Sequence, residues 1–402
     1  MSSKQYQGEF FKSFEVLEDK REEGKVLHKL IDILFIAVSA VISGCNEWGE
    51  IHLWARHNEN WLRKYLELPN GIPSTITIWR MFNAINPEQF EKCFAAWMKK
   101  VVDLAEKDIV SIDGKTMRGS QENGKSGKGV HIVSALCRSH NLVLGQVKTE
   151  EKSNEITAIP ELLNMLHIEG CIVTIDALGT QWKIAKKIVR DNKADYVLSL
   201  KGNQKTLHNE VEGYFEDLEK SGVIDELKEH KESDNGNEKF GDGSLDMITT
   251  VEKGHGRIEK RIYYFSTDTD WMIDAKKDWE KLTGIGRVER EVEIIATGKK
   301  TFEKCEYICS INNIEDFAAA ARGHWSVESM HWSLDVTFRD DENTTRKGKA
   351  PQNMAVLKRI AFNTAKADTT RYPKKSMRKK RFIALMDDEY RDFLLDLNFK
   401  DR

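Results

Sequence analysis

The sequence predicts a chain of the α/β class, with an all-helical N-terminal segment, a mixed five-stranded sheet flanked by helices, and a mainly β insertion that interrupts this core. Three observations predict this class. Apolar residues recur at helical spacing through residues 1–104. Short apolar runs alternate with helical stretches through residues 105–204. Residues 205–304 then bring a Gly- and Asn-rich loop and β-like runs, before one more strand and a helix in residues 305–343.

The N-terminal segment is expected to begin with a helix near Leu17 to Ile42 and to continue with a second from Glu47 to Leu66. Two further helices are separated by Asn86 and Pro87, because Pro fits the first turn of a helix. The first of these follows a loop and a cap within residues 71–82, Gly-Ile-Pro-Ser-Thr-Ile-Thr-Ile-Trp-Arg-Met-Phe.

The sheet is expected to draw its strands from five apolar runs, at 108–113, 130–137, 142–148, 171–176 and 195–200. Helical stretches at 155–166 and 181–192 separate the last three runs. Strand, strand, strand, helix, strand, helix, strand is the order of an RNase H-like core, in which the first and fourth strands are neighbours. A last strand at 307–311 leads into a helix that Asn312 or Asn313 can cap and that Gly323 is expected to break.

Two acids stand at the ends of strands that this order makes neighbours. Asp113 closes the run Asp-Ile-Val-Ser-Ile-Asp and Asp176 closes Cys-Ile-Val-Thr-Ile-Asp. A single Asp after a strand more often caps a helix or a turn. Two carboxylates at neighbouring strand ends, with Glu328 supplying a third from a helix, instead favour shared divalent cations, because such cations prefer hard oxygen ligands.

The helix that bears Glu328 carries a polar stripe, since His324, Glu328, His331 and Asp335 are spaced by four, three and four residues. Trp325 and Trp332, seven residues apart, are expected to pack on the core. A zinc site from Cys305 and Cys309 with His324 and His331 is a less favoured alternative. The six cysteines are scattered, several of them within apolar runs, which is typical of reduced, buried thiols.

Five blocks of the sequence carry a resemblance to a known family. They are Ser-Ile-Asp-Gly-Lys-Thr-Met-Arg-Gly (111–119), Asp-Ala-Leu-Gly-Thr-Gln (176–181), Asp-Tyr-Val-Leu-Ser-Leu-Lys-Gly-Asn-Gln (195–204), Gly-His-Gly-Arg-Ile-Glu-Lys-Arg (254–261) and the stretch from Arg322 to Phe338. Together with Gly-Ile-Pro-Ser-Thr-Ile-Thr (71–77), they resemble the DDE transposases of bacterial insertion sequences, of the H-repeat-associated type. The resemblance spans nearly the whole chain.

This resemblance implies that Asp113, Asp176 and Glu328 are the catalytic acids and the ligands of two Mg²⁺ ions, with Mn²⁺ as a substitute. It implies DNA cleavage at insertion-sequence ends and joining of the freed 3′ hydroxyl to target DNA. Related enzymes carry Tyr-x2-Arg-x3-Glu-x6-Lys around the third acid. Here His324 and Asp335 occupy the Arg and Lys positions, so those phosphate-holding roles do not carry over to them.

DNA contacts are expected from donors that follow core strands, that lie in the block 254–261, or that precede Glu328. These residues are Lys115, Arg118, Lys201, Asn203, Gln204, His255, Arg257, Arg261, Arg322 and His324. Ordinary solvated turns are the alternative interpretation of the same residues. The N-terminal segment has two open roles, a helix entering the major groove or a helical domain that stabilises the core or mediates dimerisation.

The last segment, residues 344–402, is expected to be basic and helical. Residues 344–381 contain thirteen Lys and Arg against one acid, Asp368, and seven of the thirteen lie between Arg371 and Arg381. We expect those seven to lie along a DNA backbone, because each neutralised phosphate releases counterions. A solvated face is the alternative. The net charge of −3 is no obstacle, since the placement of charges matters more than their sum.

The compartment is expected to be the bacterial cytoplasm, in association with the nucleoid. The longest apolar stretch, Ile33 to Ser43, is far shorter than the roughly 20 residues that span a bilayer, and the N-terminus shows no apolar signal core. The expected partners are terminal inverted repeats, target DNA and a second copy in a homodimer, without a membrane. Two other functions stay open: a catalytically silent DNA-binding regulator, and a metal-dependent nuclease without strand transfer.

Overall fold

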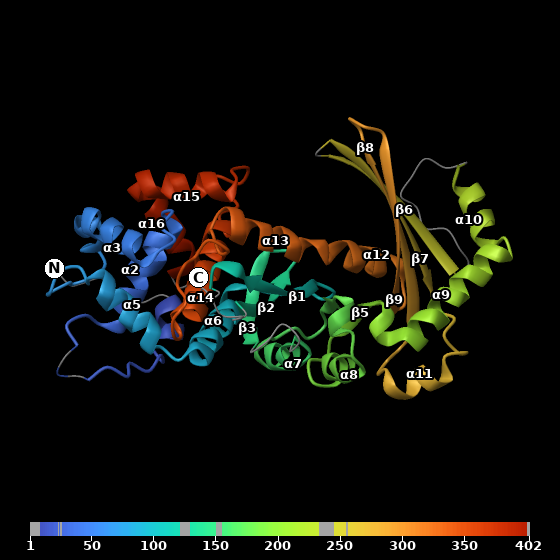
Figure 1. The fold of residues 1–402 in the computed structure, drawn as a ribbon, viewed down its shortest axis with the longest axis horizontal. Helices are drawn as coiled ribbons and strands as arrows, with labels where there is room; N and C mark the ends of the chain where they lie inside the picture. Colours follow the sequence, from blue (N-terminus) through green and yellow to red (C-terminus); the bar gives the residue numbers. More distant parts are fainter. Residues whose placement is uncertain are drawn as a thin grey trace. The chain divides into compact units, whose positions relative to one another are not determined.

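The computed structural model describes residues 9–22, 24, 26–120, 129–149, 155–232, 245–254 and 256–399 (Figure 1). The chain divides into two compact units. Unit 1 comprises Met1–Asp103, Gly114–His167 and Val327–Arg402, and unit 2 comprises Leu104–Asp113 and Ile168–Ser326. Strand β1 (Ile109–Met117) and helix α13 (Trp325–Val336) each have residues in both units. None of the described helices is both long enough and apolar enough to cross a membrane.

Unit 1 is mainly helical. Its helices are α1 (Glu9–Phe14), α2 (Leu30–Ile42), α3 (Trp48–His57), α4 (Glu59–Leu62), α5 (Thr75–Ala84), α6 (Pro87–Val101), α7 (Glu155–Met165), the greater part of α13, α14 (Ala350–Lys366), α15 (Met377–Met386) and α16 (Asp388–Phe399). Helix α2 is apolar on nearly every side and therefore buried, with α14 packed against it. The predicted cap of α5 is confirmed, because the Ser74 side chain accepts a hydrogen bond from the Thr77 N–H.

The first predicted helix is wrong at its beginning, since α2 begins at Leu30 and not near Leu17. Residues 18–22, Glu-Asp-Lys-Arg-Glu, offer no apolar stripe that packing could stabilise. The second predicted helix is divided at Asn58 into α3 and α4.

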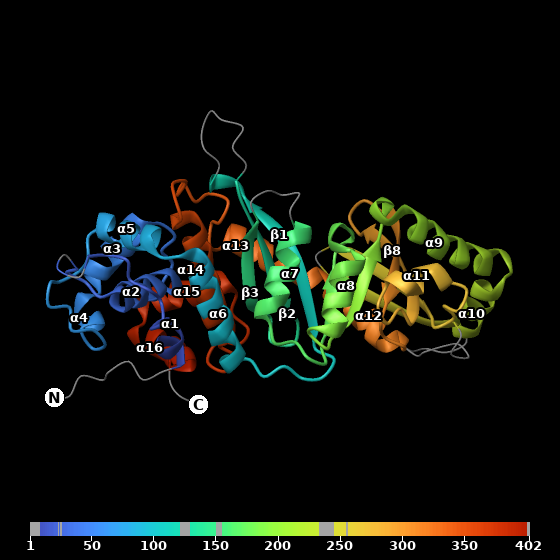
Figure 2. The same cartoon turned by 90° about the horizontal axis from the view of Figure 1, so that it is seen from below.

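Unit 1 also contains an antiparallel hairpin of β2 (Val130–Cys137) and β3 (Leu142–Thr149), with a register shift between Ala135 and Leu136. The strand order is β3-β2-β1, and unit 1 holds the last residues of β1. Helices α6 and α7 pack against β3 (Figure 2). The predicted ranges of these two strands are confirmed to within one residue.

Unit 2 carries a mixed sheet, which confirms the predicted α/β class. Its strand order is β1-β4-β5-β9-β8-β7-β6. The strands are the first residues of β1, then β4 (Ile172–Ile175), β5 (Asp195–Leu200), β6 (Leu245–Gly254), β7 (Arg257–Ser266), β8 (Gly284–Ile294) and β9 (Lys299–Cys309). The pairs β1–β4 and β4–β5 are parallel, and the others are antiparallel. The predicted neighbourhood of the first and fourth strands is confirmed.

The helices of unit 2 are α8 (Trp182–Arg190), α9 (Lys205–Lys220), α10 (Val223–Glu232), α11 (Ile273–Asp278) and α12 (Ile314–Gly323). Helix α9 packs on β9, and α12 packs on β6 and β7 from the other side of the sheet (Figure 1). Gly286 of β8 makes this second contact possible, because a Cβ there would collide with the ring of Phe317. The predicted cap Asn313 and the predicted break at Gly323 are both confirmed.

Candidate active site

Asp113 and Asp176 occupy equivalent positions on adjacent parallel strands of unit 2. The register pairs Ile109 with Ile172 and continues to Ile112 with Ile175. Asp113 is the next residue of β1, and Asp176 directly follows the last residue of β4. Neighbouring strands lie about 4.8 Å apart. Both acids are partly exposed. The two acids therefore lie next to each other at the point where β4 ends.

Asp176 enters a short turn, η4 (Ala177–Gly179), and its side chain accepts a hydrogen bond of 3.2 Å from the Gly179 N–H. The buried hydroxyl of Thr180 donates to the Ser199 carbonyl of β5 at 2.7 Å. Since Thr180 directly follows the turn, this hydrogen bond ties the end of the turn to the neighbouring strand. The turn is therefore attached at both of its ends.

Asn203 and Gln204 attach the same turn from the following loop, η5 (Gly202–Gln204). The Asn203 Nδ2 donates to the Ala177 carbonyl at 2.5 Å, and the Gln204 Nε2 donates to the Thr180 carbonyl at 3.0 Å. Both were predicted to contact DNA, but their amide donors are engaged with the backbone behind Asp176. Lys201 lies at the end of β5 and is exposed.

Polar side chains also link β1, β4 and the end of α12. The Thr174 hydroxyl lies 3.1 Å from the Ser111 hydroxyl and 3.1 Å from the His324 Nδ1, and the Ser111 hydroxyl donates to the Gly323 carbonyl at 3.3 Å. Burial lowers the pKa of His324 to about 4. The imidazole is therefore neutral near pH 7 and brings no positive charge to a phosphate.

Glu328 lies exposed in the first turn of α13. Asp335 follows it by seven residues, or about two helical turns, on the same face. In unit 1 the Lys115 Nζ lies 2.6 Å from the Asp335 Oδ1 and 2.9 Å from the Asp341 Oδ1, and its side chain is only 8% exposed. Lys115 was predicted to hold DNA, but the structure buries it between two half-buried aspartates.

The prediction that Trp325 and Trp332 pack on the core is wrong, because Trp332 is 63% exposed and Trp325 is 37% exposed. The core face of α13 is formed by Val327, Met330 and Leu334. A seven-residue spacing shows that two residues share a face, but it does not show which face is buried. The helical spacing of these three apolar residues would have predicted the buried face correctly.

The arginines of the β7 region form a cluster with carboxylates in unit 2. Arg322 donates to both oxygens of Glu252 at 3.2 and 2.9 Å, and Arg261 pairs with Glu252 and Glu259 while its side chain is 5% exposed. Arg257 is half exposed and pairs with Glu259 at 2.7 Å. The hydrogen bond from Arg322 and the nearby charges hold the pKa of Glu252 below its usual value. His255 lies outside the described residues.

Arg290 is a member of this cluster that the sequence interpretation missed. It lies opposite Arg261 in the register of β7 and β8, and its guanidinium stacks over Trp325 at 4.5 Å from the ring centroid. The alternation of side chains along β8 could have predicted the face on which Arg290 lies, because every second residue of a strand points to the same face. Arg261, Arg290 and Arg322 line a small cavity of about 60 Å³ beside Trp325.

The basic run between Arg371 and Arg381 divides into exposed and buried residues. Lys374, Lys375, Arg378 and Lys379 are exposed, as expected for phosphate contacts. Lys380 and Arg381 are 5% and 4% exposed, so the expectation that all seven basic residues lie along DNA is wrong for these two. Arg381 instead donates to the carbonyls of Val41, Cys45 and Thr337.

Of the donors proposed for zinc, Cys309 is buried, and Cys305, His324 and His331 are half-buried. Burial, followed by the charges of Arg359 and Lys115, lowers the pKa of His331 to about 3, and burial raises the pKa of the Cys305 and Cys309 thiols. Zinc binds thiolates and not thiols. These shifts favour the carboxylates as metal ligands over the cysteines.

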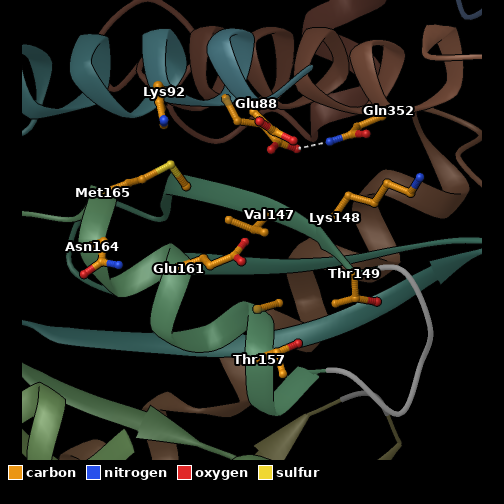
Figure 3. A pocket seen from close by; sticks show the side chains of 12 residues that line it. Glu88, Lys92, Val147, Lys148, Thr149, Thr157, Glu161, Asn164, Met165 and Gln352 are labelled. Carbon is orange, nitrogen blue, oxygen red and sulfur yellow. Dashed lines mark hydrogen bonds between the residues drawn. The ribbon is translucent and has the colours of Figure 1, made fainter. Parts of the chain in front are cut away.

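Unit 1 contains a polar cavity of about 700 Å³ between α6, β3, α7 and α14 (Figure 3). Glu91 lines it, and its Oε1 accepts hydrogen bonds from the Gln352 Nε2 at 3.0 Å and the Gln146 Nε2 at 3.3 Å. Burial is the main cause that raises the pKa of Glu91 to about 7. Lys148 and Glu161 lie at its exposed rim.

Comparison with known proteins identifies the class. A family described as "Transposase DDE domain" matches residues 104–364, and one described as "DDE_Tnp_1-associated" matches residues 11–98. The chain therefore belongs to the DDE transposases, and the resemblance seen in its motifs is confirmed.

Two relatives from Escherichia coli are similar over most of the chain. The "H repeat-associated putative transposase YhhI" of strain K12 is 38% identical over 379 residues, which cover 93% of this chain and 94% of the relative. The "Putative transposase YncI" of O157:H7 is 40% identical over 356 residues, 87% of this chain and 85% of the relative. A piggyBac transposase synaptic complex with hairpin DNA shows a TM-score of 0.41 and 10% identity over 94% of this chain and 76% of that one, too weak a likeness to assign the fold.

Proposed function

We propose that this chain cuts DNA at the ends of an insertion sequence and joins the freed 3′ hydroxyl to target DNA. The observation that carries the proposal is the equivalent placement of Asp113 and Asp176 on adjacent parallel strands, in a chain that belongs to the DDE transposases. The parallel order β1-β4-β5 with antiparallel β9 beside it supports an RNase H-like core.

Glu328 is proposed as the third catalytic acid. Asp113 and Lys115 are two residues apart on β1, so their side chains project from the same face of the strand. Glu328 and Asp335 share a face of α13. The ion pair between Lys115 and Asp335 joins these two faces in unit 1, which supports a role for Glu328 alongside Asp113.

The three carboxylates suit hard divalent cations, because they offer only oxygen donors and two of them leave adjacent strands. Asp113, Asp176 and Glu328 are the residues that would hold two Mg²⁺ ions, with Mn²⁺ as a substitute. Such ions act as Lewis acids toward the transferring phosphoryl group. The turn behind Asp176, fixed by Thr180, Asn203 and Gln204, keeps its carboxylate oriented for this task.

DNA is the proposed partner, as terminal inverted repeats and as target, and two copies of the chain are proposed to act on a pair of ends. Lys201, Arg118 and Arg257 are the sequence-predicted donors that are exposed enough to meet phosphates. Arg261 and Arg322 are engaged with carboxylates, so any contact they make with DNA would compete with Glu252. The neutral His324 is better suited to a hydrogen bond than to a charge contact.

The test is to replace each acid by its amide, as Asp113→Asn, Asp176→Asn and Glu328→Gln. Amides are weak ligands for Mg²⁺ but preserve shape, so each variant should lose cleavage while retaining affinity for end DNA. The exposed Asp191, directly after α8, serves as control, and Asp191→Asn should cleave normally. If any of the three acid variants cleaves within about tenfold of the wild-type rate, the replaced residue is not a catalytic acid.

The products of the wild-type reaction distinguish the two other functions. A strand-transfer assay with labelled end DNA and a supercoiled target should yield joined products that need a free 3′ hydroxyl. Cleavage without joined products would identify a nuclease. Tight end binding without cleavage under Mg²⁺ or Mn²⁺ would identify a silent regulator.

A further inference from the structure

The last turn of α13 and the loop after it are held in unit 1 by a series of ion pairs whose lysines are buried. Lys115 of β1 lies between Asp335 at 2.6 Å and Asp341 at 2.9 Å. Lys358 of α14 lies 3.0 Å from Asp340, and both of these side chains are fully buried. The C-terminal end of the helix that bears Glu328 is therefore fixed to a strand on one side and to a helix on the other.

Folding stability alone does not account for a buried ammonium at this place. Removing a charge from water costs several kcal/mol, and well-packed apolar residues of similar volume often stabilise a protein as well or better. Buried ion pairs are best attested where they fix a register between two elements. The elements joined here are β1, through Lys115, and α13, through Asp335.

The location of the pair relates it to the proposed catalytic acids. Lys115 is two residues from Asp113 on one strand face, and Asp335 is two turns from Glu328 on one helix face. A rotation of α13 by one residue, about 100°, would break the ion pair and turn Glu328 away from that face. Because Lys115 touches two carboxylates and is 8% exposed, its ammonium is already neutralised.

We propose that Lys115 is a positioning residue, which sets the register of α13 through Asp335 and so holds Glu328 in place for metal binding, and that it makes no contact with DNA. This inference rests on the proposed function. It assigns a structural role to a lysine whose place in the sequence, two residues after Asp113, predicted a phosphate contact.

The experiment compares Lys115→Met and Asp335→Asn with wild type in two measurements. The first is the affinity of the DNA-free protein for Mn²⁺ by titration calorimetry, which should fall about 10-fold in both variants, as for other groups that orient a metal ligand. The second is the slope of log affinity for end DNA against log salt, which should stay unchanged. A phosphate contact would instead make the slope shallower by about 0.9 and leave Mn²⁺ affinity intact.

The double variant tests more directly whether Lys115 and Asp335 act through the same interaction. The double variant Lys115→Met/Asp335→Asn should lose no more Mn²⁺ affinity than Lys115→Met alone, because Lys115→Met already breaks the ion pair with Asp335. Lys148→Met, which removes an exposed lysine of β3, is the matched control and should bind Mn²⁺ as wild type does. Should Lys115→Met fail to fold, Asp335→Asn and the exchanged pair Lys115→Asp/Asp335→Lys carry the same test, with partial recovery expected for the exchange.

Unchanged Mn²⁺ affinity in folded Lys115→Met and Asp335→Asn, or a shallower salt slope in Lys115→Met, would overturn the inference. Glu328→Gln separates this failure from failure of the proposed function. If Glu328→Gln loses Mn²⁺ affinity while the Lys115 and Asp335 variants keep it, only the positioning role is wrong. If Glu328→Gln also keeps it, the proposed metal site itself is wrong.

Discussion

Asp176 leaves strand β4 into a turn whose backbone carbonyls accept hydrogen bonds from two amide side chains of the next loop. Asn203 and Gln204 supply these donors, which bind the carbonyls of Ala177 and Thr180. Groups that orient a metal ligand without touching the metal commonly matter to metal affinity or activity by 10- to 100-fold. At the scale of single residues, the proposed site therefore includes residues beyond the three proposed acids.

Replacing Gln204 with Ala should lower cleavage by about 10-fold or more, since it frees the carbonyl of Thr180 and loosens the turn behind Asp176. Asn203→Ala should act in the same direction through Ala177. The measurement is cleavage rate against Mg²⁺ concentration, with the exposed Asn164→Ala as control. Weaker DNA binding with an unchanged Mg²⁺ requirement would mean that Gln204 contacts DNA directly.

A second prediction at the scale of single residues concerns Glu91 and the pH dependence of folding stability. Burial raises its pKa from 4.5 to about 7, with the Glu88 charge adding to the rise, while Gln352, Gln146 and the Arg359 charge oppose it (Figure 3). Because the folded state holds this proton more tightly than the unfolded state, the group contributes stability that is fully present below about pH 4.5. That contribution is lost as the pH rises through about 7.

Glu91→Gln should remove this pH dependence, because the amide does not titrate. One pKa unit corresponds to about 1.4 kcal/mol, so the difference in unfolding free energy between variant and wild type should change by on the order of 3 kcal/mol between pH 4.5 and 8. Urea midpoints at several pH values measure it. Glu161→Gln, at the exposed rim of the same cavity, should leave the wild-type dependence in place.

Helix α15 shows how two arginines of one element differ in role. Arg381 donates to the carbonyls of Val41 and Cys45 and lies over the ring of Phe338, with its guanidinium 4.2 Å from the ring centroid. Burial lowers its pKa to about 10, which still leaves it charged near pH 7. Arg378, three residues earlier, is exposed. The first arginine therefore holds α15 against α2, and the second is available to a partner.

Arg381→Ala should destabilise the protein by about 3 kcal/mol, because it leaves buried carbonyl groups without their charged donor. Arg378→Ala should change stability by less than about 0.5 kcal/mol, as is usual for an exposed substitution. Chemical denaturation of the two variants beside wild type gives both values. Equal stability of the two variants would show that the buried contacts of Arg381 contribute little.

The sequence predicted strands β2, β3, β4 and β5 to within one residue at each end, because alternation and apolar runs reflect local geometry that each strand must satisfy. The end of β4 could be predicted for the same reason to within one residue, whereas β1 continues four residues beyond its predicted end at Asp113. The pairing of these two strands, which places Asp113 and Asp176 next to each other, was predicted correctly. The strand predicted at 307–311 is wrong in its bounds, since β9 begins at Lys299 and ends at Cys309. The direction in which a helix face points depends on distant segments, so the exposure of Trp332 could not be predicted from its spacing. The burial of Arg381 depends likewise on contacts with residues more than 300 positions away.

At the scale of the whole molecule, charge is nearly balanced, with 62 Lys and Arg against 65 Asp and Glu. A balanced chain exerts little long-range attraction on DNA, so affinity must come from places where exposed cations gather. Within unit 1, Lys374, Lys375, Arg378 and Lys379 form such a place before and at the start of α15. Lys380 and Arg381 of the same segment do not contribute to DNA affinity, because they are buried and donate hydrogen bonds to backbone carbonyls.

Replacing Lys374, Lys375, Arg378 and Lys379 together with Gln should therefore weaken binding to all DNA sequences about equally. The slope of log affinity against log salt should become shallower by roughly 0.9 for each phosphate that is no longer neutralised, while preference for transposon ends over random DNA should survive. Exchange of Lys276 and Lys277 in α11 for Gln is the control. An unchanged slope would mean that the four residues are a solvated face, and a selective loss of end binding would mean that they read bases.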